Sequence, residues 1–214
     1  MAKRLGETSY KETAFGIIPR SKLILLEIEG IKRAWDFVLK KSAQNKLPLT
    51  TSFIKRIHQV GFGWIFPELG GKFRNIDVTV SKHIPPKFYL VPQEMDNFTK
   101  DLQVRIKHLP KIDDEKFLNE LIYLLAWSHH KFLWIHPFQD YNGRIGRLLI
   151  NIILLNLNLP PIELKVETTA GRKNYVKALQ LADSHNYTKL ESIFNSAINE
   201  MVKELGSKNK NNPE

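Results

Sequence analysis

One short stretch of the chain gathers groups that could bind an anion. Residues 136–147 read HPFQDYNGRIGR and lie between segments that are otherwise largely apolar. A helix that begins near Asn142 would present unpaired backbone N–H groups and a partial positive charge, and both favour an anion such as phosphate. Gly143 would let that anion approach the backbone closely, and the Asn142 amide can donate to it or cap the helix. The stretch therefore predicts a phosphate site at a helix N-terminus.

Charged side chains beside this helix start extend the predicted site. Arg144 and Arg147 are three residues apart, so they share a helix face on which guanidinium groups can bind phosphate oxygens in pairs. Asp140 could hold Mg²⁺, because one carboxylate together with phosphate oxygens is a common magnesium site. The alternative for Asp140 is an ordinary ion pair with Arg144, worth only about 0.2–0.5 kcal/mol on an exposed helix.

A histidine stands at the other end of the same stretch. The unperturbed pKa of histidine is about 6.5, so His136 could be neutral at physiological pH and accept a proton from a hydroxyl group. Pro137 disfavours a helical conformation at the residue before it, which places His136 at the end of a helix. A base, a metal ligand and a phosphate site are thus predicted at one break between two helices.

Helices must provide most of the scaffold. Apolar residues recur at helical spacing over residues 21–41, 49–61, 92–108, 113–135, 142–157 and 171–205, the last with a break near DSHN. Between the second and third of these, glycine and proline separate short runs such as IDVTV and KFYLV, which predicts a loop followed by a small β-hairpin. The expected fold is mainly α.

Length and composition indicate a globular protein. The chain has 214 residues, 43% hydrophobic and 25% charged, which suits one domain with a substantial core. We expect an N-terminal region over residues 1–48, a catalytic core over residues 49–205 and a disordered polar tail over residues 206–214.

Charge and cysteine content narrow the partners and the compartment. The net charge of +10 favours anionic partners, but the lysines are scattered rather than interleaved with aromatic residues, so nucleic acid is not indicated. The absence of cysteine excludes disulfides and thiolate chemistry and favours a reducing compartment. There is no apolar signal core near the start, and the longest apolar run is too short to span a membrane. We therefore expect a cytoplasmic protein.

The polar stretch resembles the signature of the Fic family, His-Pro-Phe-x-(Asp/Glu)-Gly-Asn-Gly-Arg-x-x-Arg. The matching residues are His136, Pro137, Phe138, Asp140, Asn142, Gly143, Arg144 and Arg147. Tyr141 stands where most members have glycine. The segments AWSHHKFLWI before the motif and LLINIILLNLNLPPI after it extend the resemblance.

The resemblance implies a helical bundle around a central helix pair that carries the motif, with a hairpin flap over residues 77–89. It also implies an enzyme that splits ATP between the α- and β-phosphates and transfers AMP to a Ser, Thr or Tyr hydroxyl of a target protein. In that reading His136 is the general base and Asp140 holds Mg²⁺ on the phosphates. The anion-binding residues are Asn142, Gly143, Arg144 and, at the γ-phosphate, Arg147.

Members of this family also inhibit themselves with a helix that carries (Ser/Thr)-x-x-x-Glu-(Gly/Asn). The N-terminal segment LLEIEGIKRAW offers Glu29 followed by Gly30, with Leu25 at the hydroxyl position. By this resemblance, Glu29 would pair with Arg147 and exclude the γ-phosphate. An ordinary exposed glutamate is the alternative for Glu29.

Other functions remain open from the sequence. A related enzyme could remove AMP, transfer UMP or phosphorylate its target as Doc-like relatives do, although those relatives have lysine at the position of Gly143. A catalytically silent interaction module is a further alternative, with Tyr141 restricting the loop or crowding the nucleotide. The target protein, self-modification and homo-oligomer formation are also left open.

Overall fold

The structure is a computed structural model that describes residues 10–81, 83–166 and 168–210. Helices dominate this part of the chain. They are α1 (Arg20–Ser42), α2 (Thr51–Phe62), α3 (Val91–Lys107), α4 (Phe117–Ile135), α5 (Asn142–Asn156), α6 (Thr169–Ala182) and α7 (Thr188–Lys210). A short 3₁₀ turn, η1 (Phe88–Leu90), leads into α3. The predicted, mainly helical fold class is confirmed.

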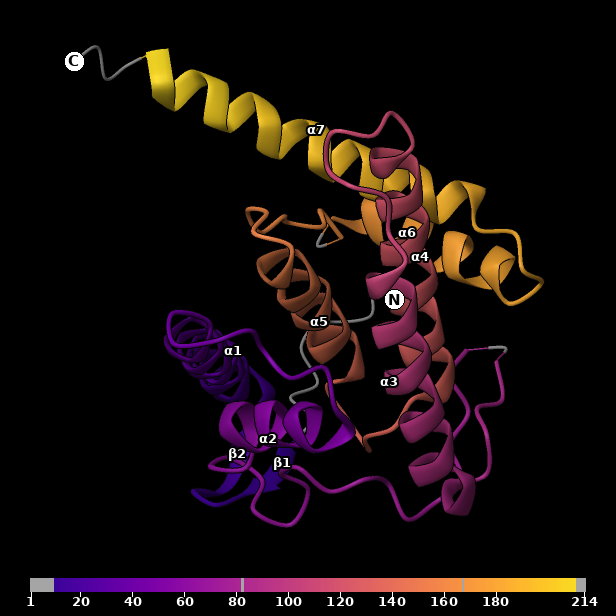
Figure 1. The fold of residues 1–214 in the computed structure, drawn as a ribbon. Coiled ribbons are helices and arrows are strands. Elements are labelled where there is room, and N and C mark those ends of the chain that lie inside the picture. The colour runs from indigo at the N-terminus through magenta and orange to yellow at the C-terminus, as the bar shows by residue number, and fades with distance from the viewer. Residues whose placement is uncertain (1–9, 82, 167, 211–214) are drawn as a thin grey trace, which may run out of the picture.

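The central helix is α4, which is surrounded by other helices (Figure 1). It packs against α3, α5 and α7. Both α4 and α5 are apolar on nearly every side, so both must be covered to remove their side chains from water. The motif joins the C-terminal end of α4 to the N-terminal end of α5. The predicted site therefore lies at one end of this central pair.

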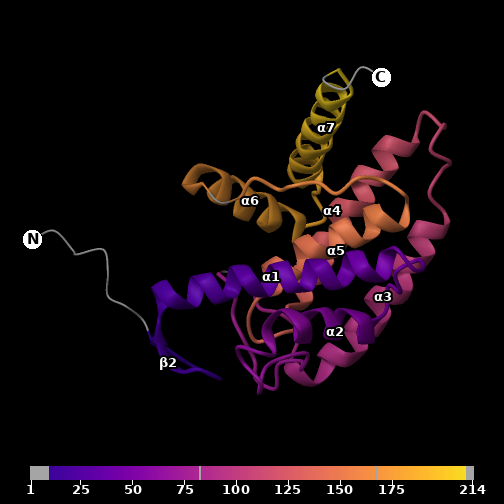
Figure 2. The ribbon, with the colours of Figure 1, turned by 90° about the vertical axis from the view of Figure 1, so that its left-hand side faces the viewer.

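The N-terminal helix α1 crosses α5 and packs most extensively on α2 (Figure 2). Its buried residues recur every three or four positions, as one face of a helix requires, and they are Leu23, Glu27, Gly30, Ala34 and Val38. At the crossing, a Cβ atom on Gly30 would lie only 2.3 Å from the Gly61 carbonyl oxygen. Gly30 is thus needed for the close packing of α1 on α2. This packing fixes the position of α1, and therefore where Glu27 contacts the motif.

The small antiparallel hairpin is not where the sequence predicted it. It joins β1 (Tyr10–Thr13) to β2 (Gly16–Pro19) at the start of the described chain. In the described residues of the predicted flap, 77–81 and 83–89, there is a single β-bridge, between Val80 and His83. Proline has no N–H to donate to a strand ladder, and Pro85 and Pro86 follow directly.

The C-terminal prediction also needs correction. Helix α7 continues to Lys210, so residues 206–210 are helical and not a disordered tail. Residues 211–214 lie outside the described part of the chain. Within that part, no helix is both long enough and apolar enough to cross a bilayer.

The close crossing at Gly30 leads to a stability prediction. In Gly30→Ala the added methyl group meets the Gly61 carbonyl, so α1 and α2 must separate, and we expect the free energy of unfolding to fall by about 1–3 kcal/mol. Chemical denaturation measures this change. Gly206→Ala is the matched control, because a Cβ there meets nothing within 4 Å and alanine favours a helix. Equal stability of Gly30→Ala and the unmodified protein would contradict the close crossing.

Candidate active site

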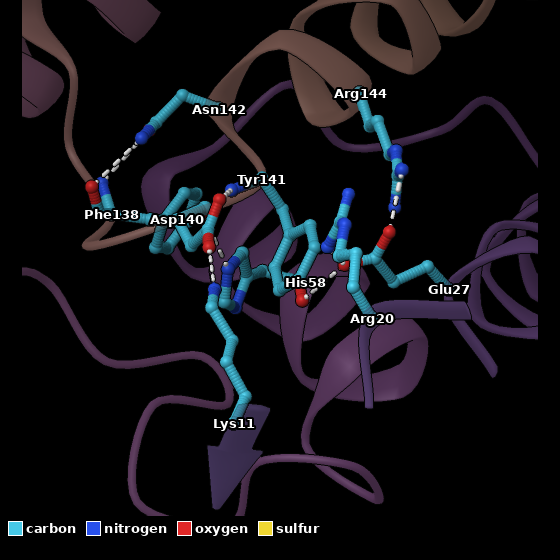
Figure 3. Close-up of polar contacts among 9 residues, drawn as sticks. All are labelled: Lys11, Arg20, Glu27, His58, Phe138, Asp140, Tyr141, Asn142 and Arg144. Atoms are coloured by element: carbon cyan, nitrogen blue, oxygen red, sulfur yellow. Dashed lines mark hydrogen bonds and ion pairs between the residues drawn. The ribbon is translucent and has the colours of Figure 1, made fainter. Parts of the chain in front are cut away.

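The turn between α4 and α5 is shaped by side chains buried beneath it. His136 and Tyr141 both have a left-handed backbone, with φ of 50° and 67°. Phe138 is fully buried and stacks on His58 with ring centroids 3.9 Å apart. The Asn142 side chain accepts from the Phe138 N–H at 2.9 Å and donates to the Phe138 carbonyl at 2.7 Å (Figure 3).

This placement changes the expected role of Asn142. Its side-chain oxygen and one of its two amide N–H groups are engaged within the turn, so at most one amide N–H remains to donate to a phosphate. The amide also holds the turn closed. The backbone N–H of Asn142 still lies in the first turn of α5, where N–H groups have no partner within the helix.

His136 ends α4 and is tied to the loop before α3. Its carbonyl accepts from Arg74 Nε at 2.8 Å, and the Arg74 N–H donates to the Pro137 carbonyl at 2.9 Å. Burial has the largest effect on the pKa of His136 and lowers it; the Leu133 carbonyl acts in the opposite direction, and the positive charge of Arg74 lowers the pKa further. The imidazole is therefore neutral near pH 7 and able to accept a proton.

A cavity of about 510 Å³ brings His136 together with most of the predicted phosphate residues. Four arginines from three helices contribute to its lining, and they are Arg20, Arg144, Arg147 and Arg172. Gly143 also lines the cavity, where an added Cβ would stand 3.7 Å from the Arg147 guanidinium. Val80 and Ser81 of the flap border the same space. The size suits a small-molecule ligand and the arginines favour an anionic one.

Asp140 is not among the residues that line this cavity, and its carboxylate is held by the N-terminal hairpin. Its Oδ2 pairs with the Lys11 ammonium at 2.7 Å, and its Oδ1 accepts from the Tyr141 N–H. Among the described residues, no group of three or more His, Cys, Asp or Glu side chains could hold a metal ion. A single carboxylate that already binds a cation fits Mg²⁺, which takes one or two carboxylates and completes its shell with phosphate and water.

A buried glutamate meets the motif from α1. Glu27 is 1% exposed and accepts from three side chains, shown converging in Figure 3. Arg20 Nη1 and the Tyr141 hydroxyl donate to Oε1 at 2.6 and 3.0 Å, and Arg144 Nη2 donates to Oε2 at 2.8 Å. Burial raises the pKa of Glu27, but Arg144, Arg20 and Tyr141 together bring it below its ordinary value. Glu27 is therefore ionised and neutralises Arg144.

The predicted Glu29–Arg147 pair is not formed. Glu29 is exposed and pairs with Arg33 one turn along α1 at 2.9 Å, while Arg147 contributes a hydrogen bond to Tyr175. Two residues along an α-helix correspond to a rotation of about 200°, so Glu27 and Glu29 face nearly opposite directions. The glutamate of α1 that contacts the motif is therefore Glu27 and not Glu29.

Tyr141 does not crowd the cavity. Its ring is buried and stacks on Phe62 of α2, with centroids 3.8 Å apart and an angle of 8° between the rings. The side chain thus points toward α1 and α2, and Tyr141 is not among the residues that line the cavity. Phe66 packs on the same ring at 5.9 Å.

Several residues of the site were not predicted, namely Lys11, Arg20, Glu27, His58, Arg74 and Arg172. Two of them carried a readable signal. Glu27 falls in the apolar stripe of α1, and a charge at a core position must find partners. His58 occupies a core position of α2 in the same way. Its Nδ1 accepts from the Gly71 N–H, its Nε2 lies 3.3 Å from the Asp140 carbonyl, and burial lowers its pKa to about 4.

The family follows from comparison with known proteins. The model of the Fic/DOC family matches residues 48–154, half of the chain and the whole motif. This chain belongs to the Fic/DOC family. A Fic relative from Nematostella vectensis, named protein adenylyltransferase Fic, is 30% identical over 172 residues, which is 80% of this chain and 38% of that protein. The chain thus spans well under half the length of the curated Fic relatives it matches.

Solved Fic structures share the fold. Fic-1 residues 134–508 from C. elegans are 24% identical, with a TM-score of 0.67 over 87% of this chain and 52% of that one. The N-terminal FIC domain of Bep8 from Bartonella sp. 1-1C is 17% identical, with a TM-score of 0.68 over 92% and 93% of the two chains. The Fic-like helical bundle expected from the motif is confirmed.

The histidines of the site give a pH prediction that does not depend on function. Because burial disfavours the imidazolium, we expect His136 to titrate below its ordinary value of 6.5 and His58 to titrate near 4. Titration of the imidazole C–H signals by NMR measures both midpoints. A midpoint for His136 above 6.5 would contradict the burial and the effect of Arg74.

Proposed function

We propose that this protein transfers AMP from ATP to the hydroxyl group of a protein substrate. The observation that carries the proposal is the shared cavity, in which a neutral histidine faces arginines and a helix N-terminus. The name of the Fic relatives, protein adenylyltransferase, supports the same chemistry. A Ser, Thr or Tyr side chain supplies the acceptor hydroxyl.

His136 is the base in this reaction. The Leu133 carbonyl lies 3.4 Å from Nδ1, so a proton assigned to Nδ1 leaves Nε2 as the acceptor. The substrate oxygen attacks the α-phosphorus while its proton moves to Nε2. The bond between the α-phosphorus and the bridging oxygen breaks, and pyrophosphate leaves. The new phosphodiester joins AMP to the substrate oxygen.

The arginines and the start of α5 bind the phosphate chain. Gly143 allows close approach to the first N–H groups of α5, while Arg144 and Arg147 reach the same cavity. One Arg144 nitrogen, Nη1, is buried without a hydrogen-bond partner among the described residues, and a phosphate oxygen would satisfy it. Arg20 would add a further positive group from α1.

Asp140 would hold Mg²⁺ when nucleotide is bound. The ion would supply positive charge to the α- and β-phosphate oxygens. Lys11 now occupies Oδ2 of the same carboxylate in an ion pair with both side chains 44% exposed, and such pairs are weak enough to exchange. Lys11 and the metal ion therefore compete for one oxygen.

Glu27 is the inhibitory group in this proposal. Its ion pair with Arg144 occupies a guanidinium that the phosphates need, so ATP must displace a buried carboxylate before it binds fully. The pair involves Arg144, the first motif arginine, rather than the Arg147 that the family resemblance implied.

The function is tested with isotopically labelled ATP and Mg²⁺. We expect label from the α-phosphate to appear on protein in a cell lysate, and none from the γ-phosphate. Without its base, His136→Ala should lose about 10²–10⁴-fold in rate. Label from the γ-phosphate would indicate phosphoryl transfer, and absence of both label and ATP binding would indicate a silent module. His108→Ala, at an exposed position in α3's C-terminal cap, is the control.

The inhibitory role predicts opposite results for two glutamates on one helix. Glu27→Ala releases Arg144, so we expect ATP to bind about tenfold tighter or better, a change of ~1.4 kcal/mol or more. Glu29→Ala removes an exposed pair with Arg33 and should leave ATP affinity unchanged. Calorimetric titration with ATP and Mg²⁺ gives both dissociation constants. Equal effects of the two substitutions would contradict a specific role for Glu27.

A further inference from the structure

The residue that replaces the family glycine is bound to both partners of the inhibitory pair. The Tyr141 hydroxyl donates to Glu27 Oε1 at 3.0 Å, and the Arg144 guanidinium lies over the Tyr141 ring at 5.4 Å from its centroid. Glycine at this position could make neither contact. The substitution therefore adds two interactions at the point where α1 meets the motif.

The backbone conformation at position 141 does not favour tyrosine over glycine, so the contacts of the Tyr141 side chain must offset the cost. Its φ of 67° lies in the left-handed region, where a side chain with a Cβ atom costs about 1–2 kcal/mol relative to glycine. The stack on Phe62, at 3.8 Å and nearly parallel, and the burial of the ring offset this cost. The stack also fixes the direction of the hydroxyl toward α1.

The two carboxylate oxygens of Glu27 accept hydrogen bonds from different partners. Oε1 accepts from Arg20 and from the Tyr141 hydroxyl, and Oε2 accepts from Arg144. Arg20 is 43% exposed at its side chain, so water can take its place. The Tyr141 ring, in contrast, is buried and stacked on Phe62. Its hydroxyl therefore determines how Oε2 is presented to Arg144.

We propose that Tyr141 is a positioning residue that holds Glu27 on Arg144 and thereby strengthens the inhibition of nucleotide binding. The inference rests on the proposed function, in which Arg144 binds the phosphates of ATP. Tyr141 acts through Glu27 and does not touch the nucleotide. The family position that is usually glycine thus becomes, in this chain, a third member of the inhibitory contact between α1 and the motif.

The test is the affinity for ATP with Mg²⁺, measured by calorimetry in a double-mutant cycle. Tyr141→Phe keeps the ring, its stack on Phe62 and its contact with Arg144, and it removes only the hydroxyl. We expect Tyr141→Phe to bind ATP about five- to tenfold tighter than the unmodified protein, since a hydrogen bond to a charged group is lost from the inhibited state alone. In a Glu27→Ala background, Tyr141→Phe should have no further effect.

Two controls separate positioning from packing. Tyr187→Phe removes a buried hydroxyl 3.4 Å from His130, next to a different cavity, and should leave ATP affinity unchanged. Thermal unfolding of every variant checks that it folds. A role for Tyr141 in packing alone would leave ATP affinity unchanged in Tyr141→Phe, because the ring remains.

The outcomes distinguish this inference from the proposed function. If Glu27→Ala binds ATP more tightly but Tyr141→Phe does not, the positioning role is overturned and the proposed function stands. If Tyr141→Phe has the same effect with and without Glu27, the hydroxyl acts elsewhere and the inference is overturned. If no variant binds ATP, including Glu27→Ala, the proposed function fails and the inference fails with it.

Discussion

The site depends on an ionised carboxylate buried between two parts of the fold. Moving a carboxylate out of water costs several kcal/mol unless charged and polar groups replace the lost hydration. Glu27 recovers that cost from Arg20, Tyr141 and Arg144, which come from α1, the motif turn and α5. Removing any one of them leaves the charge less compensated. The position of α1 is therefore coupled to the positions of Tyr141 and Arg144 in the motif.

This coupling gives the N-terminal segment two contacts with the predicted nucleotide site. At one, Glu27 neutralises an arginine that would bind phosphate. At the other, Lys11 of β1 occupies the carboxylate that would bind the metal ion. The Ala14 N–H also donates to the Ile65 carbonyl at 2.9 Å, which fastens the hairpin to the chain after α2. One segment thus pairs with both Arg144 and Asp140.

The sequence predicted the helices and the motif residues of the site better than the contacts between side chains from distant parts of the chain. Helical periodicity located the helices, and the motif placed His136, Gly143, Arg144 and Arg147 at one cavity, because these residues are close in the chain. The Lys11 and Arg74 contacts join residues far apart in sequence, and no local pattern encodes them.

Glu27 is a different case, because its position in the stripe of α1 was visible from the spacing of Leu23 and Ala34. The resemblance to the inhibitory pattern favoured Glu29 through Gly30, but the structure explains Gly30 by its close contact with Gly61. A helical-face argument would have placed Glu27, and not Glu29, on the buried side of α1. The β-bridge at Val80 likewise shows that β-branched residues alone do not make a hairpin beside two prolines.

The central claim is that Glu27 and the phosphates of ATP compete for Arg144. A crystal structure of the unmodified protein with Mg²⁺ and a non-hydrolysable ATP analogue tests it most directly. If they compete, the Arg144 guanidinium leaves Glu27 and contacts phosphate oxygens, and the Glu27 side chain moves away from its 2.8 Å contact with Arg144. A fully bound triphosphate beside an intact Glu27–Arg144 pair would contradict it.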